Sequence, residues 1–170
     1  MSTELIEIAE LVTSWSASDE QVEAVVTSDR ETEVRAYEGE IESLTVAESQ
    51  GIGVRVIKDG RQGFAYAGTL EENELLEVLS EARDNASFAS PDEFSGLAEP
   101  DGVESVSLDV YSDGVNSLAT NKKIDYALEL EKLTLATDKR ISGIESSEYT
   151  DVVSESAIAT STGIRSSSKE

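Results

Sequence analysis

The residues best suited to binding chemistry gather in one short segment in the first half of the chain. Gly51 and Gly53 would let another backbone or a phosphate approach closely. The cations that follow could receive a carboxylate, and they are Arg55, Lys58 and Arg61. A phosphate-binding loop needs a strand, a glycine loop and then a helix N-terminus aimed at the anion. Because these glycines open a run of alternating apolar residues, we expect close packing at the glycines and ion pairs at the cations.

Catalytic side chains are scarce elsewhere in the sequence. The chain has no cysteine and no histidine, which removes thiol nucleophiles, histidine bases and the usual zinc ligand sets. Ser166 and Lys169 have the spacing of the serine nucleophile in penicillin-binding enzymes, but the partner motifs of those enzymes do not accompany them. We therefore assign no catalytic residue and no metal ligand to this chain.

The charge of the chain bears on its partners. The 170 residues include 13 basic and 36 acidic ones, which gives a formal net charge of −23. Such a charge repels phosphate, so we expect no nucleic-acid partner and no anionic membrane surface. No apolar run is long enough to span a bilayer, and the N-terminus lacks the basic residues of a signal peptide. A cytoplasmic protein is the resulting expectation.

Apolar spacing predicts the elements that must position the candidate residues. A helical period covers residues 3–14, after which the period changes to the two-residue alternation of strands. An antiparallel meander of about five strands is predicted at residues 21–28, 31–37, 41–48, 51–58 and 61–68. Asp59 and Gly60 form a strong hairpin signal between the last two strands, which brings Arg55 and Arg61 into neighbouring strands.

Helical and irregular segments dominate the second half. A helix is predicted at residues 69–89, and residues 91–120 contain both prolines and many acids without a period, which is typical of a long loop. A third helix, at residues 121–138, carries apolar residues on two sides and is expected to contact two surfaces. One side contains Ile124, Ala127, Leu128 and Leu135, and the other contains Tyr126, Leu130 and Leu133.

Together these elements predict an α+β fold: an N-terminal helix, the meander, a helix, a long loop, a helix and further strands from residue 144 onward. The expected organisation is a helix-meander-helix unit at residues 1–90 and an acidic loop or crossing segment at 91–120. A helix with strands at 121–170 would belong to the same domain. The last strand follows Gly163 without a later partner, so we expect a longer native chain to complete the sheet.

Ordered stretches along the chain resemble the N-terminal region of the TldD/PmbA family. The resemblance lies in residues 37–42, 51–57 and 59–65, continues through the helix to residues 86–92, and resumes at 138–141 and 161–164. It thus covers nearly the whole chain. The segments at residues 90–92 and 138–141 are more similar to the PmbA branch, also called TldE, than to the TldD branch.

The resemblance implies part of a zinc metallopeptidase, a hydrolase that cleaves peptide bonds. Members of this family have been called modulators of DNA gyrase and are regarded as subunits of a bacterial metallopeptidase. The zinc motif of the TldD branch, of the HExxxH type, lies in the C-terminal half of that protein, and no position of this chain matches it. Zinc is therefore expected only in a partner subunit or a C-terminal region, and a PmbA-like chain would be the non-catalytic partner in a heterodimer.

The function that follows is a non-catalytic N-terminal domain that contributes to dimer assembly with a TldD-like subunit and to access of unfolded peptides. An extended peptide could add to an exposed strand edge, where backbone hydrogen bonds give affinity with little sequence preference. The candidate peptide-binding residues are Gly51, Gly53, Arg55, Arg61, Gly63 and Phe64.

An alternative function is a stand-alone acidic protein-binding module with no link to proteolysis. Residues 71–104 contain eleven acidic residues against a single cation, Arg83. Modules that bind basic partners usually place their acids along one face, whereas these acids are spread over a helix and a loop. Solubility therefore explains most of them.

Overall fold

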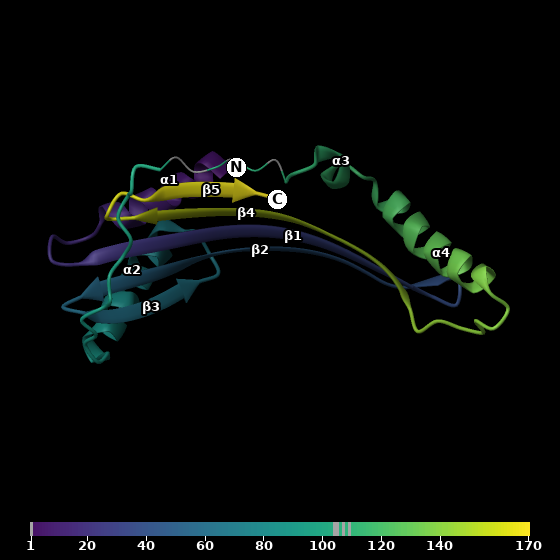
Figure 1. Ribbon diagram of the computed structural model, residues 1–170, viewed down its shortest axis with the longest axis horizontal. Helices are drawn as coiled ribbons and strands as arrows, with labels where there is room; N and C mark the ends of the chain where they lie inside the picture. The colour runs from purple at the N-terminus through teal and green to yellow at the C-terminus, as the bar shows by residue number, and fades with distance from the viewer. Residues whose placement is uncertain (1, 104–105, 107, 109) are drawn as a thin grey trace. The chain divides into compact units, whose positions relative to one another are not determined.

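The computed structural model describes residues 2–103, 106, 108 and 110–170 (Figure 1). The elements are, in chain order, α1 (Ser2–Ser14), β1 (Gln21–Tyr37), β2 (Glu40–Lys58), β3 (Arg61–Ala67), α2 (Glu72–Phe88), α3 (Asp113–Asn116), α4 (Thr120–Thr137), β4 (Ser147–Thr160) and β5 (Arg165–Lys169). The strands form a five-stranded sheet in the order β3-β2-β1-β4-β5. The α+β class and the order of elements predicted from the sequence are thus confirmed.

The strands are longer than the sequence segments suggested. The five segments predicted between residues 21 and 68 form three strands, because β1 and β2 continue through polar stretches that look like breaks in the sequence. Arg30 lies in the first of these stretches and forms an ion pair with Glu48, the residue just before the second, with 3.5 Å between Arg30 Nε and Glu48 Oε1. Exposed, charged cross-strand pairs are compatible with an unbroken strand.

Two tight turns connect the first three strands. Glu38 and Gly39 join β1 to β2 with φ angles of 53° and 77°, and Asp59 and Gly60 join β2 to β3 with φ angles of 51° and 70°. Positive φ at both central residues is the geometry of the two-residue hairpin turn that matches the twist of the strands. The hairpin predicted from Asp59 and Gly60 is therefore confirmed.

Contacts within the chain divide it into two compact units. Unit 1 comprises Met1–Ser28, Ser49–Asp109 and Ser154–Lys169, and unit 2 comprises Asp29–Glu48, Val110–Val153 and Glu170. Strands β1, β2 and β4 contribute residues to both units.

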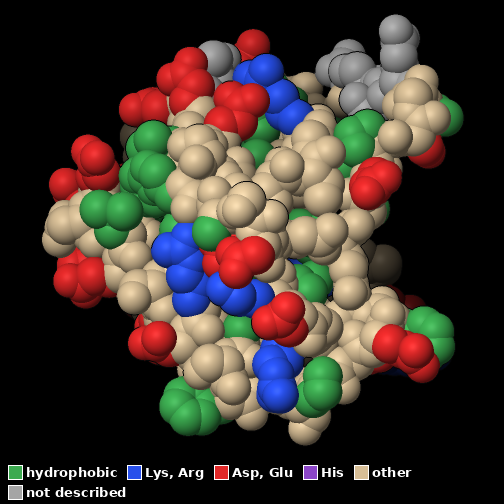
Figure 2. Space-filling view, turned by 90° about the vertical axis from the view of Figure 1, so that its left-hand side faces the viewer, with side chains coloured by type: hydrophobic (Ala, Val, Ile, Leu, Met, Phe, Trp, Pro, Cys, Tyr) green, Lys and Arg blue, Asp and Glu red, His purple; other side chains and the backbone are tan. Residues whose placement is uncertain are grey.

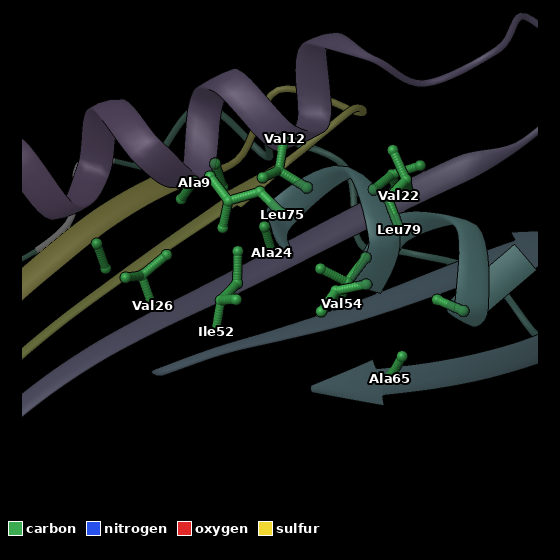
Figure 3. Close-up of a cluster of buried hydrophobic side chains, with 14 of the residues drawn as sticks. Ala9, Val12, Val22, Ala24, Val26, Ile52, Val54, Ala65, Leu75 and Leu79 are labelled. Atoms are coloured by element: carbon green, nitrogen blue, oxygen red, sulfur yellow. The ribbon is translucent and has the colours of Figure 1, made fainter. Parts of the chain in front are cut away.

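Unit 1 is built around an apolar core between the sheet and two helices (Figure 3). Helix α2 packs along β3, and α1 packs along β5. The core side chains alternate along each strand, as expected for a sheet with one covered face. They include Val22, Ala24 and Val26 from β1, Ile52, Val54 and Val56 from β2, and Ala9, Val12, Leu75 and Leu79 from the helices.

Unit 2 has a smaller apolar cluster, formed by Val34 and Ala36 from β1 and Ala127 from α4. Ile124 and Leu128 pack against it, as the helical spacing predicted. Helix α4 also buries Lys123 and Glu131, which the apolar pattern alone did not indicate.

The long segment between α2 and α4 is tied to unit 1 near its start. The backbone N–H of Asp92 donates to Gly60 O at 2.8 Å, and the N–H of Leu97 donates to Gln21 Oε1 at 2.8 Å. Thr162 donates its hydroxyl to Ala98 O at 2.7 Å. These bonds hold the segment beside the β2–β3 turn and the ends of β1 and β4.

Candidate functional site

Half of the predicted peptide-binding residues lie together on one face of the sheet in unit 1. Register places Arg55 opposite Phe64 and Gly53 opposite Tyr66. Because residues directly opposite each other share a face, these four residues lie on the face away from the core. The guanidinium carbon of Arg55 is 5.9 Å from the centre of the Phe64 ring, a cation–π distance. Sequence reasoning missed Tyr66, although its spacing of two residues from Phe64 could have indicated it.

This face, which we call the outer sheet face, combines the exposed aromatic rings of Phe64 and Tyr66 with the ion pair of Arg55 and Glu23. Phe64 is 56% exposed and Tyr66 is 86% exposed. Arg55 pairs with Glu23, with 2.7 Å between Arg55 Nη2 and Glu23 Oε1, and the pair is partly shielded from solvent. Such a surface can stack on apolar side chains of an extended chain, while the ion pair fixes the arginine in place.

The glycines of the predicted site differ in what surrounds them. Gly53 has no heavy atom within 4 Å of the position where a Cβ would stand, whereas a Cβ on Gly51 would lie 2.8 Å from Ala67 O. A Cβ on Gly63 would overlap the backbone of Ala82 and Ala86 in α2. Gly63 therefore serves close packing of α2 on β3, and only Gly53 leaves open space at the outer sheet face.

The outward edge of β3 is partly occupied. The sheet order makes β3 an edge strand, and its Phe64 carbonyl accepts a hydrogen bond of 2.8 Å from Asn85 Nδ2 of α2. The opposite edge strand is β5. An added strand would therefore find an acceptor of β3 already in use.

Arg61 lies apart from Arg55, at a hollow beside the β2–β3 turn. This hollow of about 270 Å³, which we call the basic cavity, is lined by Lys58, Arg61 and Arg83 together with Glu20 and Asp59. Figure 2 shows basic side chains gathered on the side of the molecule where the β2–β3 turn lies, with acidic side chains next to them. Three of the 13 basic residues of a chain with net charge −23 thus line one cavity.

The cations of the basic cavity are held by bonds to the protein. Arg83 donates from Nε to both oxygens of Glu20 at 3.1 Å, from Nη2 to Glu20 Oε1 at 2.6 Å and from Nη2 to Trp15 O at 2.8 Å. Lys58 Nζ lies 2.7 Å from Asp19 Oδ2. Arg61 donates from Nη1 to Ala89 O.

Glu20 remains ionised in this setting. Its side chain is only 3% exposed, and this burial acts to raise its pKa. The hydrogen bonds from Arg83 and from the Ala17 N–H outweigh the burial, so the pKa of Glu20 lies below its ordinary value of 4.5. The charge of Glu20 is paired with Arg83, and it also adds to the stronger effect of Asp19 in raising the pKa of Lys58.

Unit 2 contains a buried polar cluster on the inner side of α4. Lys123 Nζ lies 2.6 Å from Asp151 Oδ2 and 3.2 Å from Thr32 Oγ1, and both charged side chains are buried. The same Nζ lies 5.9 Å from the centre of the Tyr149 ring. Burial, and then the hydrogen bond and negative charge of Asp151, raise the pKa of Tyr149 to about 12.

The opposite side of α4 exposes large apolar side chains. Tyr126, Leu130 and Leu133 follow one helical stripe and are all at least half exposed, whereas Lys123 and Glu131 on the inner side are buried. The helix is also neutral, because its three basic residues are matched by three acidic ones. The second contact surface predicted from the two-sided apolar pattern is not supplied by the described residues.

Zinc, which the family resemblance implies, does not fit the residues of this chain. The sequence has no histidine and no cysteine, and no group of three or more potential acidic ligands gathers among the described residues. Within the described part of the chain, no helix is both long and apolar enough to cross a membrane.

Two models of one protein family match separate stretches of the chain. One, described as PmbA/TldA metallopeptidase domain 1, matches residues 22–86. The other, described as PmbA/TldA metallopeptidase central domain, matches residues 113–170. The two matches together cover most of the chain. The parts outside them are residues 1–21, which include α1, and residues 87–112, which lie mainly between α2 and α3.

Individual relatives agree with these matches. The chain is 24% identical over 136 residues to the metalloprotease PmbA of Escherichia coli O157:H7, which covers 79% of this chain and 30% of the relative. A structure from Thermotoga maritima, described as a modulator of a DNA gyrase, has a TM-score of 0.81 at 21% identity and covers 96% of this chain and 36% of that one. The structure of TldE from Thermococcus kodakarensis has a TM-score of 0.75 at 22% identity, and the match covers 99% of this chain and 37% of that one.

The chain therefore spans about a third of the length of the proteins that it matches. The two structures share its fold at low identity.

Proposed function

Since the chain belongs to the PmbA/TldD metallopeptidase family, we propose that it is a non-catalytic N-terminal part of a zinc metallopeptidase subunit of the PmbA (TldE) branch. The ordered match to domain 1 and then to the central domain is the observation that carries this proposal. In this function the chain assembles with a TldD-like subunit, which would supply the zinc and the hydrolysis of peptide bonds. Its own residues would position the partner and the unfolded substrate.

The apolar stripe of α4 supports the assembly part of the proposal. Helix α4 exposes large apolar side chains on one side and buries charged ones on the other. An exposed apolar surface of this kind is typical of a site that binds another protein. The occupant that we assign is the TldD-like subunit. Helix α4 has equal numbers of basic and acidic residues, whereas α2 has five acids and one cation, so a subunit can approach α4 with less repulsion.

The outer sheet face supports the part that concerns unfolded peptides. Its exposed Phe64 and Tyr66 offer contact area that any apolar side chain can use, and the open space at Gly53 permits a backbone to come close. Recognition of this kind depends little on sequence, which suits an unfolded substrate.

The test uses the full-length protein from which the chain derives, co-expressed with the TldD-type subunit of the same organism. We expect the two to co-purify as a heteromer and to cleave an unfolded polypeptide, with activity lost on chelation and absent from this protein alone. Failure to associate, together with absence of metal-dependent cleavage, would contradict the proposal. Binding that instead disappears as salt rises, to a basic protein unrelated to proteolysis, would favour the acidic-module alternative.

A matched pair of substitutions tests the role of α4. Leu130 of α4 and Leu76 of α2 are 52% and 50% exposed, so Leu130→Glu and Leu76→Glu change the surface equally. We expect only Leu130→Glu to weaken association with the TldD-type subunit, by at least tenfold. Equal effects of the two variants, or self-association of the protein through α4, would remove the assignment of this partner to α4.

A further inference from the structure

We propose that the basic cavity of unit 1 binds the carboxylate at the C-terminus of a peptide. The lining of the cavity indicates that the ligand is a carboxylate. That this carboxylate belongs to a peptide rests on the proposed function. The basic cavity lies beside the β2–β3 turn, where Lys58, Arg61 and Arg83 converge in a chain that is otherwise strongly acidic.

The two arginines that line the cavity keep N–H donors that their internal bonds do not use. Arg61 uses one terminal nitrogen for Ala89 O, and Arg83 uses Nε and Nη2 for Glu20 and Trp15. None of the described residues bonds Arg61 Nε, Arg61 Nη2 or Arg83 Nη1. Arginine N–H groups matched to a carboxylate form short, charge-assisted hydrogen bonds.

The surroundings hold these donors in place before a ligand arrives. The buried carboxylate of Glu20 accepts hydrogen bonds from two nitrogens of Arg83, Nε and Nη2. The turn that carries Arg61 is fixed by the hydrogen bond from the Asp92 N–H to Gly60 O, and a Cβ on Gly60 would lie 2.8 Å from Asp92 O. Donors that are already oriented lose less conformational freedom on binding.

Size and polarity define the ligand class. A volume of about 270 Å³ lies below the range of pockets for drug-sized ligands, so the group that enters is small. Val56 and Ala86 also line the cavity and provide an apolar wall for a side chain next to the carboxylate. A single terminal residue of a peptide, with its carboxylate and an aliphatic side chain, combines these properties.

The end of α2 lowers the positive potential of the basic cavity. Ala86 and Ser87 belong to the last turn of α2, where the helix dipole is negative. Asp59 adds a further negative charge to the lining. These features reduce the advantage that the cations would give to a doubly charged phosphate, and the apolar wall of Val56 and Ala86 favours a carboxylate that carries a side chain.

The experiment measures binding to the 170-residue chain by two-dimensional amide NMR and by the fluorescence of Trp15, whose carbonyl bonds Arg83. The probes are N-acetyl-alanyl-leucine, the same dipeptide with a C-terminal amide, and inorganic phosphate. We expect the free acid to shift the amides around residues 58–61 and 83–87, and to bind at least tenfold more tightly than the amide and than phosphate. Equal affinity for acid and amide, or tighter binding of phosphate, would overturn the proposal.

Substitutions locate the binding to the cavity. Arg61→Gln and Lys58→Gln should each weaken binding of the free acid by about tenfold, the effect of one lost charge-assisted bond. Arg140→Gln is the matched control, because it removes one cation from an exposed position in unit 2 and should leave binding unchanged. If Arg61→Gln fails to fold, Lys58→Gln, whose side chain is half exposed, supplies the same test. Wild-type affinity in a folded cavity variant would refute the site. Because no partner subunit takes part, this result is independent of the assembly test above.

Discussion

The two units of this protein are stabilised in different ways. In unit 1, apolar side chains from four strands and two helices form one continuous core, and its ion pair joins a buried Glu20 to a partly exposed Arg83. In unit 2, the apolar cluster is small, and the side of α4 that faces the strands buries Lys123 and Glu131. Stability therefore depends on packing in unit 1 and on satisfied charges in unit 2, which mutations can separate.

The largest effect is expected at the buried pair of unit 2. Lys123→Ala leaves Asp151 buried without its cation and should lower the free energy of unfolding of unit 2 by about 3–5 kcal/mol. The double variant Lys123→Met, Asp151→Leu removes both charges and should recover most of that loss. Urea unfolding followed by tyrosine fluorescence and helical circular dichroism measures both. Additive losses in the double variant would show that the pair is not coupled.

A comparable loss in unit 1 should come from a cavity in the core. Leu79 is fully buried between α2 and the sheet, so Leu79→Ala should cost about 2–5 kcal/mol. Leu133→Ala makes the same change at an exposed position of α4 and should cost less than about 0.5 kcal/mol in the free protein. Urea unfolding monitored by Trp15 fluorescence reports on the first variant. Similar costs at the two positions would contradict the described burial.

A smaller difference should separate two glycines that the sequence placed in one candidate site. Gly63→Ala forces α2 away from β3 and should cost about 1–3 kcal/mol, whereas Gly53→Ala meets open space and should change stability by less than about 1 kcal/mol. Thermal unfolding of both variants checks this. Equal destabilisation would mean that α2 can shift at no cost.

Acid should affect unit 1 through Glu20. The pKa of Glu20 is lower in the folded protein than its ordinary value of 4.5, so the folded state binds this proton less readily than the unfolded state. The stability from this group is present above about pH 4.5 and is lost as the pH falls through the folded value. Glu20→Gln should therefore make unfolding of unit 1 less dependent on pH, by at most one proton. An unchanged slope below pH 4.5 would contradict this cause.

Alkali should affect unit 2 through Tyr149. Its pKa is raised from 10.0 to about 12, so the stability that it contributes is present below pH 10 and is lost as the pH rises toward 12. Titration by ultraviolet absorbance should show a tyrosine that ionises near pH 12, and Tyr149→Phe should remove that step. Its persistence in the variant would assign the late titration to another tyrosine.

The order and class of the elements could be predicted because apolar spacing and turn residues are local signals. Strand length could not be predicted, because polar residues such as Arg30 look like a break in the sequence, and Arg30 pairs with Glu48 only when β1 and β2 meet. The burial of Lys123 could not be predicted either, because it depends on the ion pair with Asp151, which is distant in the sequence. Among the candidate site residues, register separates Gly53, Arg55 and Phe64 from Gly63 and Arg61, and register is not visible in composition. Whether they bind a peptide stays a prediction.

The hydrogen bond from Asn85 to the Phe64 carbonyl bears on polymerisation. A chain that stacks into fibrils through its sheet needs two available edges, one to receive a neighbour and one to offer to the next. One acceptor at the β3 edge is already used within the molecule. By occupying this acceptor, Asn85 makes the β3 edge a poorer template for a neighbouring strand.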